Sequence, residues 1–264
     1  MPVSNHYRML NGRLYDAVPA ALYRARSNDH ARRLAQSEWL IRDKRDGGYV
    51  ASLRRGRLEF FQLSALCMPR VDAIAELLFT DSGAGGYRPT TDLDPLLWEL
   101  GLNADRYRAE TGLQPVAEPM QLEYAGRDRY QRPLWLDYDT GKAWQRMHQA
   151  ALADGVALHA ISGFRSPFYQ MAIFRRKLAR GVTLEAILEV NAAPGFSEHH
   201  SGRAIDIGTR DEPAAEQSFE HTPAFNWLIR HAGRFGFRMS FPRGNPHGIG
   251  YEPWHWYWLG SDQS

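Results

Sequence analysis

Two short stretches in the last third of the chain constrain its fold most, because their chemistry requires them to meet in space. The first, Ser197–Asp206, contains His199 and Asp206, and the second, Glu252–His255, contains a carboxylate and an imidazole. A catalytic zinc ion takes three nitrogen or oxygen ligands from the protein and leaves a fourth position for water. Hydrolysis also needs a general base beside that water. The two stretches together hold this set, so the fold must bring them into one site.

These residue types predict a zinc peptidase with one Zn2+ ion per chain. His199, Asp206 and His255 are the expected ligands, and Glu252 is the expected general base. Taken singly, each residue has an ordinary structural explanation. A histidine is more often hydrogen-bonded than metal-bound, and Asp206 could be a turn residue. The prediction therefore depends on the combination of the four.

The spacing inside the first stretch supports the metal site. Gly202 lets the backbone turn sharply between His199 and Asp206. His200 could compete with His199 as the ligand, although the spacing to Asp206 favours His199. The helical His-Glu-x-x-His pattern of other zinc peptidases is absent, so a different zinc scaffold is expected.

Composition and hydropathy exclude several other classes of protein. The 264 residues predict one large or two small domains. The formal net charge of +2 does not indicate a nucleic-acid-binding surface, so we expect no nucleic-acid partner. No stretch approaches the ~20 apolar residues that span a membrane. We expect a monomer, and we expect the single cysteine, Cys67, to be buried in its apolar run.

The N-terminus shows no basic start followed by an apolar segment, so no secretion signal is recognised. If the chain is complete, a cytoplasmic location is expected. The alternative is a periplasmic protein, or one exported by another route.

The two parts of the chain differ in how much their sequence predicts. Residues 1–117 give weak signals and are expected to form an N-terminal α/β extension of unknown role. Residues 118–264 mix helical and strand patterns, which predicts an α+β domain. Its expected architecture is a small mixed or antiparallel sheet with flanking helices that carries the zinc site. The expected elements include helices over 29–41, 141–153 and 167–178, a hairpin over 48–63, and strands over 203–207 and 254–258.

Three blocks of sequence, in this order, resemble one known family. Ser162–Gln170 is similar to a Ser-Gly-Tyr-Arg-Ser segment, with Phe164 in place of the usual tyrosine. Ser197–Asp206 reads Ser-x-His-x-x-Gly-x-Ala-x-Asp, and Glu252–His255 reads Glu-x-Trp-His. The blocks resemble the D-alanyl-D-alanine carboxypeptidases of the VanY type, within the wider group of lysostaphin-type peptidases and hedgehog domains. The resemblance covers residues 118–260, and the N-terminal part has no such counterpart.

The resemblance implies a role for each matching residue. It makes His199, Asp206 and His255 the zinc ligands and Glu252 the general base. It also implies that the substrate's terminal carboxylate and carbonyl oxygen are held by Arg165, Gln170 and Ser197. Arg165 suits this role, because a guanidinium offers a carboxylate a rigid fork of two donors. The implied partner is a peptidoglycan stem peptide, from which the terminal D-alanine is removed at a D-Ala-D-Ala or an L,D-type bond.

Other mechanisms and functions can be weighed against this one. None of the three lysines has a serine three positions before it, and no Gly-x-Ser-x-Gly motif occurs, so a serine-type peptidase is not indicated. A peptidoglycan endopeptidase or lysis enzyme on the same scaffold stays open. So does a non-catalytic zinc-bearing binding module, although Glu252 argues against it because a purely structural site has no use for a base. Recognition of a free carboxylate by Arg165 would distinguish a carboxypeptidase from an endopeptidase.

Overall fold

The computed structural model describes six ranges of the chain, and the structural statements below concern these residues alone. The ranges are 7–24, 28–61, 68–79, 86–88, 90 and 93–260. The expected burial of Cys67 lies outside them. No helix within these ranges combines the length and the apolar character that crossing a membrane requires. The chain divides into two compact units, Met1–Tyr87 with Pro119–Tyr124, and Arg88–Glu118 with Ala125–Ser264.

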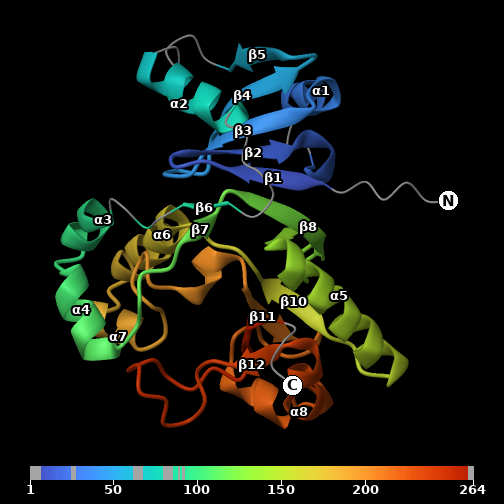
Figure 1. Cartoon of the computed structure of the whole chain (residues 1–264), viewed down its shortest axis with the longest axis vertical. Helices are drawn as coiled ribbons and strands as arrows, with labels where there is room; N and C mark the ends of the chain where they lie inside the picture. The colour runs from blue at the N-terminus through green and yellow to red at the C-terminus, as the bar shows by residue number, and fades with distance from the viewer. Residues whose placement is uncertain are drawn as a thin grey trace. The chain divides into compact units, whose positions relative to one another are not determined.

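The first unit is an antiparallel sheet with two helices (Figure 1). Strands β1 to β5 each pair with the next, and β1 also pairs with the start of β8. Arg55 and Gly56 form the turn between β4 and β5 with φ angles of 47° and 73°, which confirms the expected hairpin. The elements are β1 (Arg8–Asn11), β2 (Tyr15–Pro19), α1 (Asn28–Gln36), β3 (Trp39–Asp43), β4 (Tyr49–Arg54), β5 (Arg57–Phe60) and α2 (Met68–Phe79).

The expected helix over 29–41 is wrong in its second part. Helix α1 ends at Gln36, and the chain enters β3 at Trp39. Leu40 and Ile41 are fully buried in β3, which pairs with β2 on one side and β4 on the other. Two flanking strands and a buried face override the local helical pattern, because strand preference depends on neighbours distant in the sequence.

The second unit contains a four-stranded antiparallel sheet with strand order β10-β11-β13-β12. Helices flank this sheet, so the expected α+β architecture is confirmed (Figure 1). The chain passes between the units at β6 (Tyr87–Arg88), β7 (Glu118–Pro119) and β8 (Gln121–Arg127). The elements that follow β6 in this unit are α3 (Asp94–Glu99), α4 (Ala104–Thr111), β9 (Pro133–Leu136), α5 (Tyr138–Ala153), β10 (His159–Ser162), α6 (Pro167–Leu178), α7 (Leu184–Leu188), β11 (Ala204–Gly208), α8 (Pro223–His231), β12 (Phe237–Met239) and β13 (His255–Trp258).

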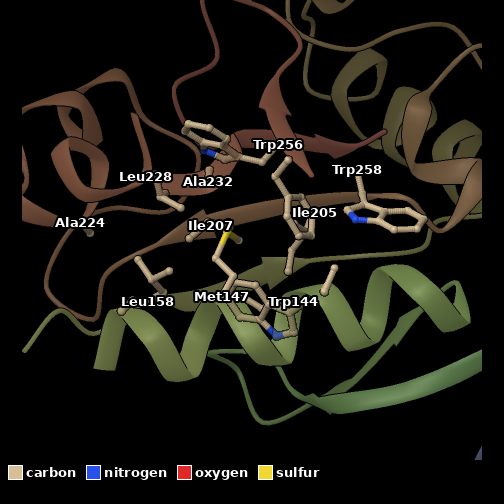
Figure 2. Packing of buried hydrophobic residues seen from close by; sticks show 14 of the residues in the cluster. Trp144, Met147, Leu158, Ile205, Ile207, Ala224, Leu228, Ala232, Trp256 and Trp258 are labelled. Carbon is tan, nitrogen blue, oxygen red and sulfur yellow. The ribbon is translucent and has the colours of Figure 1, made fainter. Parts of the chain in front are cut away.

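The core of the second unit lies between α5 and the sheet. Helix α5 contributes Trp144 and Met147 from one face. Figure 2 shows these side chains in one cluster with Ile207 of β11 and with Trp256 and Trp258 of β13. Successive side chains of a strand point to opposite faces. Since Trp256 and Trp258 face this core, His255 and Tyr257 lie on the other side of the sheet.

The compact units do not divide at residue 117. Leu97 and Tyr107, which precede that position, share a buried cluster with Phe196. The rings of Tyr107 and Phe196 meet edge to face with centroids 4.9 Å apart, and the Tyr107 hydroxyl accepts the N–H of Ala193 at 3.1 Å. Residues 88–118 therefore support the segment that leads into Ser197. The functional division between 1–117 and 118–264 stays a prediction.

Candidate active site

Strand pairing and one tight turn bring the two sequence stretches together. Asp206 in β11 stands directly opposite His255 in β13 in the antiparallel register. His199 lies on a 3-10 turn, Glu198–Ser201, that Gly202 ends in the left-handed conformation with a φ of 68°. Only glycine adopts this conformation without steric cost, so the expected turn at Gly202 is present. The chain then enters β11 and reaches Asp206.

Three atoms that could act as metal ligands converge where these strands and the turn meet. His199 Nε2 lies 3.2 Å from Asp206 Oδ1, and His255 Nδ1 lies 3.1 Å from the same oxygen. The three side chains are buried, with 5% exposure or less. The chain has thus placed two imidazole nitrogens and one carboxylate oxygen together away from bulk water.

The second nitrogen of each imidazole has its own hydrogen-bond partner. His199 Nδ1 donates to the Gly163 carbonyl oxygen at 2.7 Å, because a carbonyl can only accept. His255 Nε2 donates to Glu198 Oε2 at 2.8 Å. Partners of this kind hold metal-binding histidines in the required tautomer. When both imidazoles are neutral, the other two nitrogens, His199 Nε2 and His255 Nδ1, carry no proton, and each directs its lone pair toward Asp206.

The buried charges shift the pKa values of these groups in different directions. Burial, with Arg165 acting in the same direction, lowers the pKa of His199 to about 4. Burial would also lower the pKa of His255, but hydrogen bonds to Asp206 and Glu198 outweigh it and raise the value to about 10. Burial opposes ionisation of Asp206, yet His199 and Arg165 hold its pKa well below the usual range.

The donor set fits a bound metal ion. Within the described residues, His199, Asp206 and His255 offer ligand atoms that all lie within 4.8 Å of one another. His199 Nε2, His255 Nδ1 and the Asp206 carboxylate would hold such an ion. Two imidazoles and one carboxylate are a ligand set typical of catalytic zinc. The role of these residues as ligands stays a prediction.

Glu252 lies at the edge of this group. Its Oε2 is 4.0 Å from His255 Nδ1, and its backbone N–H donates to the Phe241 carbonyl oxygen at 3.0 Å. The side chain is nearly buried, and burial raises its pKa to about 7. General bases are most effective when their pKa lies near the working pH. Glu252 therefore has both the position and the basicity expected of a base.

All seven residues expected at the site line one cavity of about 590 Å³ within the second unit. Residues from β11, β13 and α6 and from the segments before them contribute. The seven are Arg165, Gln170, Ser197, His199, Asp206, Glu252 and His255. The expectation that these seven residues share one site is thus met in the cavity, although their individual roles remain predictions.

Arg165 makes a contact that the sequence did not predict. Its Nη2 donates to Asp206 Oδ2 at 3.0 Å. Arg165 thus contacts one oxygen of the Asp206 carboxylate, and the two imidazoles contact the other. Its Nε is buried and has no partner among the described residues. The guanidinium therefore orients Asp206 and keeps one further donor beside the cavity.

His200 is excluded as a competing ligand by its own hydrogen bonds. It is fully buried, its Nδ1 donates to the Arg165 carbonyl oxygen at 2.5 Å, and its Nε2 accepts the Gly195 N–H at 3.0 Å. Both ring nitrogens are thus occupied by backbone groups. His200 holds the segments on either side of the site together, and His199 faces Asp206.

Two residues of the site were missed from the sequence. Glu198 accepts the hydrogen bond from His255, and Lys177 lines the cavity from the last turn of α6. Glu198 directly precedes His199 in the motif, which was a usable signal. Lys177 follows Gln170 by seven residues, or two helical turns, so a shared helix face could have indicated it.

Comparison with known proteins agrees with this geometry. The family model "VanY: D-alanyl-D-alanine carboxypeptidase" matches residues 133–261. The chain is 31% identical over 143 residues to YodJ of Bacillus subtilis, a carboxypeptidase candidate, with 53% of this chain and 51% of YodJ covered. It is 32% identical over 126 residues to the D-alanyl-D-alanine carboxypeptidase of Enterococcus faecalis, with 44% and 45% covered. The match thus spans about half the length of these relatives.

Among solved structures, the chain resembles the vancomycin resistance D,D-pentapeptidase VanY from a VanB-type cassette, which was solved in complex with Zn(II). The identity is 28%, the match covers 49% of this chain and 75% of that one, and the TM-score is 0.42. The resemblance expected from the three sequence blocks is confirmed by the family match over both ligand stretches. Residues 133–261 match the model of the VanY family of D-alanyl-D-alanine carboxypeptidases.

Proposed function

We propose that this chain is a zinc-dependent carboxypeptidase that removes the terminal D-alanine from peptidoglycan stem peptides. The convergence of His199 Nε2 and His255 Nδ1 on Asp206 Oδ1 carries this proposal. Two lone pairs and a carboxylate face one another in a buried place, and a divalent cation is the group that satisfies all three. The family whose model residues 133–261 match supports the reaction and the substrate class.

The residues of the chain would divide the work as follows. Zinc, when bound, lowers the pKa of a water molecule and polarises the scissile carbonyl. Glu252 accepts a proton from the attacking water at its carboxylate and later donates it to the leaving amine. Arg165 holds Asp206 through Oδ2, and its buried Nε is a donor for negative charge that develops on the substrate. The nearly complete burial of Glu252 keeps bulk water from competing for the proton.

The proposal is tested by metal content and by the products formed. Full-length protein is expected to bind one zinc ion, and His255→Ala is expected to lose it. Mass spectrometry of defined tetrapeptide and pentapeptide stems would show loss of a single D-alanine, and would tell a D-Ala-D-Ala bond from an L,D-type bond. Wild-type protein that binds no zinc, or that releases only internal fragments, would contradict the proposal. The second result would indicate an endopeptidase on the same scaffold.

A further inference from the structure

The wall of the cavity formed by α6 contains the groups that decide how a substrate is held. Arg165 comes just before the helix, Gln170 lies in its second turn, and Lys177 lies in its last turn. Each could act on a substrate that ends in a carboxylate. Their hydrogen bonds within the protein show which of them is available.

Arg165 is already paired. Its Nη2 donates to Asp206 Oδ2 at 3.0 Å, and the two side chains are 17% and 7% exposed. Asp206 is an expected zinc ligand, so removing its arginine would disturb the metal site. A guanidinium held in this way is poorly placed to give its whole fork to a substrate carboxylate.

Gln170 presents the wrong atom for a carboxylate. Its Nε2 donates to the Ala192 carbonyl oxygen at 2.9 Å, and since a carbonyl only accepts, this bond sets the orientation of the amide. Gln170 Oε1 is then buried with no partner among the described residues. An oxygen acceptor attracts an N–H and repels a carboxylate. The geometry favours Gln170 as the acceptor for a substrate N–H, in contrast to the role implied by the family resemblance.

Lys177 is the cation that remains. It lines the cavity, is half-buried, and makes no hydrogen bond or ion pair with any residue that the structure describes. Lys177 follows Gln170 by two helical turns, so both lie on one side of α6, and both line the cavity. Burial lowers the pKa of Lys177, while the charges of Glu252 and Arg165 act on it in opposite directions.

We propose that Lys177 binds the free C-terminal carboxylate of the substrate, while Gln170 Oε1 accepts an N–H of the terminal residue. The inference rests on the proposed carboxypeptidase function and deepens it, because it names the residue that selects a free chain end. In this arrangement Arg165 holds Asp206 and stabilises the negative charge that develops on the scissile carbonyl oxygen. Lys177 is a specificity-determining residue that leaves the metal site itself untouched.

A cycle of two protein forms and two substrates tests the proposal. Zinc-loaded full-length wild type and Lys177→Met would each be given one stem peptide with a free C-terminus and the same peptide as its C-terminal amide. We expect the wild-type preference in kcat/KM for the free peptide to fall by about 10–150-fold in Lys177→Met, the range for a hydrogen bond to a charged group. The change should appear mainly as a higher KM for the free peptide, and the kcat/KM for the amide should be almost unchanged. Lys177→Arg, which keeps the charge, should retain most of the preference.

Arg176→Met is the matched control. Arg176 lies in the same turn of α6, but it is exposed, lies over the Tyr169 ring at 5.9 Å and does not line the cavity. It should keep the full wild-type preference. An equal loss in both variants would show a general effect of helix charge and would overturn the proposal.

The outcomes separate this inference from the function on which it rests. Wild type that cuts both peptides equally would contradict the carboxypeptidase itself. Wild type that prefers the free peptide, together with Lys177→Met that keeps the whole preference, would overturn only the role of Lys177. Lys177→Gln provides the same comparison should the methionine variant fail to fold.

Discussion

Each unit of this protein contains a buried group of charged side chains, and the two groups are balanced in different ways. In the first unit, Asp16 pairs with Arg42 and Asp43 pairs with Arg45. The buried Lys44 donates to two oxygens, at 2.9 and 3.0 Å. Every charged side chain in this group therefore has a hydrogen-bond partner within the chain.

In the second unit, the charged side chains are not all paired within the chain. Glu198, Asp206, Glu216 and Glu252 line one cavity with Arg165 and Lys177, and the raised pKa of His255 favours a positive charge on its imidazole. His199 and His255 converge on Asp206, and Lys177 has no hydrogen-bond or ion-pair partner among the described residues. We expect the first group only to stabilise the fold, whereas under the proposed function the second group would be completed by a metal ion and a substrate. The contrast separates a structural network from a functional one, and it can be tested by removing charges in either unit.

The largest expected effect is on turnover, from Glu252→Gln. Glutamine has nearly the same shape but cannot accept the proton, so kcat should fall by about 10²–10⁴-fold, the usual contribution of a general base. Zinc content should stay at one per chain. Activity within a few-fold of wild type would remove Glu252 from the mechanism.

The same variant should change how stability depends on pH in the metal-free protein. Burial raises the pKa of Glu252 to about 7 in the folded state, against about 4.3 when unfolded. The folded state then binds more protons between these values, so the free energy of unfolding falls as pH rises through that window. Glu252→Gln should remove this decrease, as measured by urea unfolding at pH 4.5 and pH 7.5. An unchanged pH dependence would show that Glu252 is not the group responsible.

Stability of the second unit should depend on apolar packing. Leu97 is fully buried beside Phe196, so Leu97→Ala should lower the free energy of unfolding by about 2–5 kcal/mol. Chemical denaturation measures this, with Trp98→Ala on the same helix as a control because Trp98 is 70% exposed. Equal effects of the two changes would mean that residues 88–118 do not pack as described.

Charge removal in the first unit should affect stability and leave the metal site intact. Asp16→Ala leaves the Arg42 guanidinium without its partner. Loss of a buried partner costs 3–5 kcal/mol, and we expect about 3 kcal/mol because the Arg42 side chain is 31% exposed. The exposed Arg106–Glu110 pair is the control, since Arg106→Ala should leave the free energy of unfolding almost unchanged. Loss of zinc from Asp16→Ala would break the distinction between the two groups.

The smallest effect should come from His200→Ala. This change leaves the Gly195 N–H and the Arg165 carbonyl oxygen without their partner, at a cost of about 1–3 kcal/mol for buried groups. Zinc should still bind at one ion per chain, as measured by metal analysis. Loss of zinc with an intact fold would reopen the question of which of the two adjacent histidines is the ligand.

The sequence predicted those features that depend on local chemistry. The helix start at Ser166 and Pro167, the turn at Gly202, and the four proposed metal-site residues all follow from residue type and spacing. The other three expected cavity residues came from the family resemblance. Strand β3 could not be predicted in this way, because its partners β2 and β4 decide its conformation. The orientation of Gln170 was equally hidden, since it depends on the carbonyl of Ala192, 22 residues away.

The register between β11 and β13 also determines when this site can form during synthesis. Asp206 and His255 are 49 residues apart in the chain, yet they stand directly opposite each other. A nascent chain that has passed His199 and Asp206 holds two of the three donors, and the third is absent until residue 255 has been made. Pairing in the wrong register by one residue would turn His255 into the core and Trp256 toward Asp206. Binding of a metal ion by these three side chains would therefore be a late event that depends on correct pairing of the two strands.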